Sequence, residues 1–173
     1  MTRTLVSTST LAAIVLLLAG LVPRASAQTF VPTGRDTLRG LPGVEVAVEN
    51  LEDDVERDGL TGVAIKSDVE QRLRARGILV YASQKANPSD AKAFLYVHVT
   101  SVKLAPQDLY AIGVQVHLRQ TMRSLVTASN VVDAMTWDAN DLIVLPVRSV
   151  TSARTTIQEL VDKFIDDWSR VHR

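Results

Sequence analysis

Two histidines, His98 and His117, are the residues whose type and spacing come nearest to a metal site. Each lies in a stretch of alternating apolar and polar residues and falls at a polar position, so both are expected on one side of neighbouring strands. One hairpin register would set the two imidazoles opposite each other, close enough to share a metal ion, and a register two residues different would separate them. Because no third ligand accompanies the pair, we predict no metal centre.

Other arrangements that support catalysis are missing from the sequence. Asp166 and Asp167 are neighbours on an expected helix, so their side chains diverge by about 100° and do not act on one bond. The chain has no Gly-x-Ser-x-Gly turn of a serine hydrolase and no glycine-rich phosphate loop. Zero cysteines exclude disulfides, thiolate metal sites and a cysteine nucleophile. We therefore predict no catalytic residue, no cofactor and a non-enzymatic protein.

The elements that would position these residues begin with a strand, a helix and a strand. Val44, Val46 and Val48 alternate with polar or small residues, which is typical of a half-buried strand. A helix is expected from Thr61, its cap, to Gly77, with apolar residues at i, i+4 and i+8. A second strand follows at 78–81. The acidic segment 50–59 between the first strand and the helix is predicted to be a solvated loop.

Three further strands and a helix complete the expected fold. Alternation predicts strands at 94–100, 112–119 and 131–137, arranged as an antiparallel meander. A strongly amphipathic helix is expected over 151–171. We predict an α+β two-layer sandwich over 43–173, in the order βαββββα, with a mostly antiparallel sheet of about five strands and two helices on one face. Residues 28–42 are predicted to be an extended lead-in.

The polar side of the central strands combines aromatic and cationic residues, a mixture enriched at protein interfaces. We predict a partner surface there, for an envelope protein or a second copy of the chain. A half-exposed sheet face with ordinary cross-strand pairing is the alternative interpretation. The residues of this predicted surface are Phe94, Tyr96, His98, His117 and Arg119.

An apolar pocket is the second hypothesis. Residues 138–147 are unusually apolar for a connection, so this predicted loop is expected to pack on the body or to meet a partner. A pocket between the last helix and the sheet would then be lined by Leu142, Leu145, Phe164 and Trp168. The corresponding function is that of a carrier of a small apolar or lipid ligand.

The first 27 residues have the pattern of a secretory signal peptide. Arg3 precedes the apolar run 11–22, which is too short to cross a bilayer and is followed by Pro23. The small residues 25–27 predict cleavage between Ala27 and Gln28. Later segments are also too short to span a membrane, so we expect an exported, periplasmic or secreted chain without an integral membrane segment after cleavage.

Charge argues against nucleic acid as a partner. The chain carries 19 Lys and Arg residues against 19 Asp and Glu residues. Removal of residues 1–27 takes away two arginines and no acidic residue, which leaves a weakly acidic protein. Since nucleic-acid binding depends on excess positive charge, we predict no nucleic-acid partner.

Several segments of the sequence resemble those of a family of small exported bacterial proteins of unknown function. They are RDTLRGLPGVEV at 35–46, DVEQRLRARGI at 68–78, Thr136-Trp137 and LVDKFIDDW at 160–168. The resemblance covers nearly all of the chain after residue 27. It implies an exported single domain and supplies no catalytic or binding residues. The Gly77-Ile78 junction after an arginine-rich helix is also similar in outline to sheet-and-helix domains of periplasmic envelope proteins.

Overall fold

The computed structural model describes residues 34–127 and 129–173. The predicted signal peptide and the first part of the predicted lead-in lie outside these residues. The described chain has five strands, three α-helices and four short 3-10 helices. The strands are β1 (Gly43–Val48), β2 (Leu79–Tyr81), β3 (Phe94–Leu104), β4 (Leu109–Arg123) and β5 (Val131–Pro146). The helices are α2 (Asp53–Arg57), α3 (Gly62–Ala75), α4 (Ala153–Val171), η1 (Gly34–Leu38), η2 (Gln84–Ala86), η3 (Ala105–Gln107) and η4 (Val147–Ser152).

The strands form one mixed sheet in the order β2-β1-β3-β4-β5. β1 pairs in parallel with β2 and with β3 over short stretches. The antiparallel pairings of β3 with β4 and of β4 with β5 are much longer. The predicted strand–helix–strand unit and the antiparallel meander are both present. The fold is therefore an α+β sandwich with a five-stranded sheet, as predicted.

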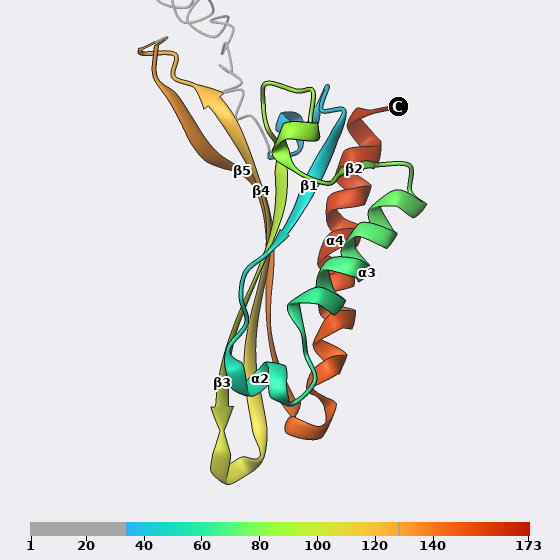
Figure 1. Cartoon of the computed structure of the whole chain (residues 1–173), viewed down its shortest axis with the longest axis vertical. Coiled ribbons are helices and arrows are strands. Elements are labelled where there is room, and N and C mark those ends of the chain that lie inside the picture. Colours follow the sequence, from blue (N-terminus) through green and yellow to red (C-terminus); the bar gives the residue numbers. More distant parts are fainter. Residues whose placement is uncertain (1–33, 128) are drawn as a thin grey trace, which may run out of the picture. The chain divides into compact units, whose positions relative to one another are not determined.

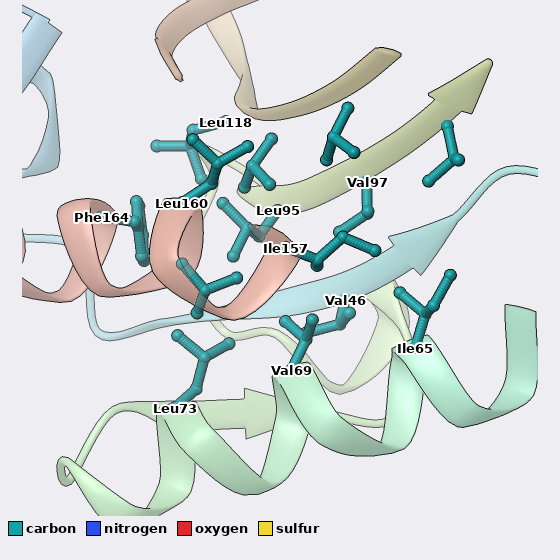
Figure 2. Packing of buried hydrophobic residues seen from close by; sticks show 14 of the residues in the cluster. Val46, Ile65, Val69, Leu73, Leu95, Val97, Leu118, Ile157, Leu160 and Phe164 are labelled. Carbon is teal, nitrogen blue, oxygen red and sulfur yellow. The ribbon is translucent and has the colours of Figure 1, made fainter. Parts of the chain in front are cut away.

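Both long helices lie on the same side of the sheet (Figure 1). Val46 of β1, Leu95 and Val97 of β3 and Leu118 of β4 point toward them, as Figure 2 shows. α3 contributes Ile65, Val69 and Leu73 to this interface, and α4 contributes Ile157, Leu160 and Phe164. These side chains are at most 1% exposed, so one continuous hydrophobic core joins the two layers.

The ends of α3 form where the sequence predicts them. The Thr61 hydroxyl accepts a hydrogen bond from the backbone N–H of Ala64 at 3.3 Å, which satisfies one of the free donors of the first turn. Gly77 follows the helix with φ = 78°, a left-handed conformation that glycine adopts without strain. The chain can therefore turn directly from α3 into β2.

Two predicted irregular segments are ordered elements instead. The described part of the extended lead-in contains η1, and its Leu38 is fully buried, so the prediction of an unpacked lead-in over 28–42 is wrong there. The predicted solvated loop 50–59 contains α2 with the buried residue Val55. Each of these polar segments contains too few apolar residues to show a periodic pattern in the sequence. Nevertheless, Leu38 anchors η1 to the core and Val55 anchors α2.

β5 differs most from its prediction. It continues through the apolar segment 138–147 that was expected to be a loop, because these residues pair with β4 as far as Pro146 opposite Leu109. A bulge beside Leu118 and Arg119 shifts the register, so that Trp137 faces the helices and Met135 does not. Strict alternation over the predicted strand 131–137 would instead place Met135 and Trp137 on one face.

Among the helices of the described ranges, none combines the length and the apolar character that a membrane crossing requires.

Candidate interaction surface

The five residues of the predicted partner surface lie together on the sheet face opposite the helices, here called the outer face. Phe94, Tyr96 and His98 occupy successive outward positions of β3. Arg119 pairs directly with Phe94, and His117 pairs directly with Tyr96. Strand alternation and an unbroken register between β3 and β4 produce this grouping.

These side chains contact and partly cover one another. The Tyr96 and His117 rings are 5.0 Å apart, and the Phe94 and Tyr96 rings meet edge to face at 6.3 Å. The Arg119 guanidinium lies 5.7 Å from the centre of the Phe94 ring and forms an ion pair with Asp133 at 2.5 Å. The cluster is therefore half-buried by its own contacts, and no helix of the described residues lies on top of it.

The register separates the two histidines. His98 pairs with Gln115 rather than with His117, so the imidazoles are diagonal neighbours. The Nδ1 atom of His98 contacts the Glu49 carboxylate instead. In the described parts of the chain, no group of three or more potential metal ligands comes together.

His117 has the most unusual environment in the cluster. The residue is only 9% exposed, and within the part of the chain that the structure describes its Nδ1 atom has no hydrogen-bond partner. Burial, together with the nearby positive charge of Arg119, lowers the pKa of His117. Burial and the carboxylate of Glu49 raise the pKa of Tyr96. The centre of the cluster is thus uncharged at neutral pH and is flanked by charged groups.

The outer face continues into a group of exposed aliphatic residues, here called the aliphatic end. Val102 and Val144 face the same β4 residue, Ala111, from its two sides, and Leu142 lies opposite Gly113. The exposed fractions are 61% for Val102, 38% for Leu104, 72% for Leu142 and 58% for Val144. Contiguous apolar exposure of this kind marks interaction surfaces more often than single exposed leucines do.

The residues of the predicted apolar pocket are not brought together. Phe164 and Trp168 belong to the core, where Phe164 packs edge to face against Trp137 at 5.2 Å. Leu145 packs at the margin of the core, whereas Leu142 points to the outer face. Because β5 replaces the expected loop, alternation sends Leu142 away from the helices.

Several charged groups have structural partners. Asp167 accepts hydrogen bonds from Arg35 Nε at 2.7 Å and from Trp137 Nε1 at 3.1 Å, which ties η1 and β5 to α4. Lys103 and Tyr110 both donate to Asp58 and lower the pKa of its carboxyl group. Two ion pairs connect α3 and α4, at Asp68–Arg154 and Arg72–Asp162.

Sequence reasoning missed Val102, Leu104 and Val144 as members of the outer face. The alternation of β3 contained the signal for Val102 and Leu104, which have the same parity as Phe94, Tyr96 and His98. For Val144, Leu142-Ile143-Val144-Leu145 is a continuous apolar run without alternation, and such a run does not identify the exposed side of a strand.

Comparison with known proteins gives no family for this chain. Neither a scan against protein-family models nor a search of the curated proteins produced a match.

Proposed function

We propose that this protein is an exported, periplasmic, non-enzymatic binding protein that works as an accessory of an envelope assembly and holds a protein partner on its outer face. The observation that carries the proposal is the aliphatic end: four exposed aliphatic residues on a sheet face that none of the described helices covers. Burial of such residues is the main favourable term in protein association.

The neighbouring aromatic cluster supplies groups that make an interface specific. Tyr96 and Phe94 present flat, partly exposed rings, and Arg119 and Glu49 provide opposite charges beside them. Aromatic residues and arginine are enriched in interface cores, where rigid rings lose little conformational entropy on binding. The cluster and the aliphatic end together form one surface across β3, β4 and β5.

The signal-peptide pattern of residues 1–27 supports export, and the resemblance to small exported bacterial proteins agrees with it. Ion pairs with Lys103, Arg154 and Arg72 lower the pKa values of Asp58, Asp68 and Asp162, and each pair connects two elements of the fold. A structural cause for these shifts supports a non-enzymatic role. The carrier hypothesis is less well supported, since Phe164 and Trp168 fill the core with their own rings.

Site-specific photo-crosslinking in the native host tests the proposal. A photoreactive residue replaces Val102 on the outer face, and a matched control replaces Ser67, which is exposed on α3 in the opposite layer. We expect a crosslinked product of discrete mass from position 102 and none from position 67. Equal labelling from both positions, or labelling from neither, would contradict the proposal.

A further inference from the structure

The free edge of β5 is a second feature of the surface that carries the proposed function. β5 is the last strand of the sheet and is 16 residues long, whereas β2 at the opposite edge has three residues. Among the described residues, η1 contacts β5 near Thr136, whose carbonyl accepts a hydrogen bond from the Thr37 hydroxyl at 3.3 Å. Long uncovered edges are templates for pairing with another strand.

The backbone groups of the free edge can be assigned by alternation. The Val147 N–H donates to the carbonyl of Asp108, so odd-numbered residues of this part of β5 are directed to β4. The N–H and C=O groups of Asp138, Asn140, Leu142 and Val144 then face outward. In agreement, the Leu142 N–H donates a hydrogen bond of 2.8 Å to the side-chain carboxylate of its neighbour Asp141.

The charged side chains of β5 are all acidic. β5 carries three aspartates and no lysine or arginine. Asp133 is neutralised by Arg119, but within the described residues neither Asp138 nor Asp141 forms a salt bridge with a lysine or arginine. The exposed edge from Asp138 to Val144 therefore combines two carboxylates with the aliphatic side chains of Leu142 and Val144.

A second copy of the chain fits this edge poorly. Antiparallel pairing of β5 with itself over 138–144 sets Asp141 opposite Asp141 of the second copy at the centre, and Asp138 opposite Val144. Like charges that are directly opposite across a sheet are destabilising. Asp141 thus disfavours this self-pairing, and together with Asp138 it leaves the edge complementary to a cationic strand.

We propose that the free edge of β5 binds an extended segment of a partner protein by strand addition, and that this segment carries aliphatic residues followed by lysine or arginine. The inference rests on the proposed binding function and names its partner chemistry. In antiparallel orientation, aliphatic residues of the segment meet Val144 and Leu142 first, and its cations then meet Asp141 and Asp138. A partner carbonyl replaces the Asp141 carboxylate at the Leu142 N–H, which frees that carboxylate for an ion pair.

A synthetic peptide of this pattern tests the inference with the purified chain. The probe is a blocked peptide with alternating Val and Thr in its first half, followed by two lysines three positions apart with Thr between them, so that one lysine faces each side of the sheet. Binding is followed by isothermal titration and by amide exchange of β5. We expect saturable binding and slower exchange at Asn140, Leu142 and Val144. Absence of binding up to millimolar peptide overturns the inference.

Two controls separate backbone pairing from charge attraction. The same peptide with alternate backbone amides N-methylated retains every side chain but cannot pair as a strand, so we expect its binding to be lost. The variant carrying Asp138→Asn and Asp141→Asn should bind the unmodified peptide about tenfold more weakly at low salt. Equal binding of the methylated peptide would overturn strand addition.

A proline substitution links the edge to the cellular partner. Leu142→Pro removes an outward N–H without removing a bond to β4, whereas Leu142→Thr keeps the N–H and serves as its control. If crosslinking from position 102 persists in Leu142→Pro, the outer face binds its partner without the edge, and only the strand-addition inference fails. If no outer-face crosslink forms in the wild-type chain, the proposed function itself fails. The methylated peptide tests the wild-type chain and needs no folded variant.

Discussion

At the level of single residues, His117 shows how burial among neighbouring side chains of a sheet face lowers the pKa of a histidine. Its ring packs at a tilt against Tyr96, its Nδ1 atom finds no partner among the described residues, and burial lowers its pKa. The unfolded chain exposes the same histidine with an ordinary pKa of about 6.5. Protonation therefore favours the unfolded state over the pH range between the two values.

We expect the free energy of unfolding to fall as the pH decreases through about 6.5, because the unfolded chain takes up a proton at His117 more readily than the folded chain does. His117→Phe keeps the ring contact with Tyr96 and removes the titration, so this fall should become smaller. Urea unfolding at pH 7.5 and 5.5 measures the effect. An equal fall in the wild type and the variant would contradict the assignment to His117.

Tyr110 provides a second residue-level prediction. Burial, and the hydrogen bond from its hydroxyl to Asp58, raise the pKa of Tyr110 to about 12. Its stabilising contribution should be fully present below about pH 10 and should be lost as the pH rises toward the folded value. In an absorbance titration of the three tyrosines, the latest step should disappear in Tyr110→Phe. Tyr96→Phe is the comparison variant, and loss of the same step there would reassign it.

At the level of elements, α3 and α4 are joined by the core and by two ion pairs at its margin. Arg154 donates two hydrogen bonds of 2.6 Å to Asp68, and Arg72 donates to Asp162. The side chains of the Asp68–Arg154 pair are 17% and 40% exposed, so water screens their attraction. We expect these pairs to fix the position of the two helices relative to each other, and to contribute little to the free energy of unfolding.

A double-mutant cycle with Asp68→Ala and Arg154→Ala should give a coupling energy of about 1 kcal/mol or less at neutral pH. The hydrogen bonds from Arg154 lower the pKa of Asp68, so the coupling should be present above about pH 4 and be lost as the pH falls through the lowered value. Chemical unfolding provides the measurement. The exposed Glu70–Arg74 pair within α3 is the control, and a larger coupling there would contradict the prediction.

At the level of the whole molecule, the uneven covering of the sheet is the main feature. Both long helices cover one face of the sheet. The aromatic cluster and the aliphatic end lie on the outer face, next to the free edge of β5. The proposed export of the chain would place this surface among the proteins of the envelope.

Export has a direct test at this scale. Chain recovered from the host envelope should begin at Gln28, and its intact mass should correspond to residues 28–173. Ala27→Arg should cause the precursor to accumulate, because the small-residue requirement at the cleavage site is then broken. Intact mass spectrometry measures both forms. A mature chain that still begins at Met1 would contradict the predicted cleavage.

The sequence by itself determined the α+β class, the order of the five strands and the two long helices, and the five residues that share the outer face. These features depend on local sequence patterns. The alternation of β3 and β4 identifies the two faces of the strands, and Thr61 and Gly77 mark the ends of α3. Only the tertiary structure decided the register, which separates His98 from His117, and the bulge and length of β5, which expose Leu142 and form a free edge. These features depend on pairing between residues far apart in the chain. A continuous apolar run such as 142–145 has no local signal that distinguishes its two sides.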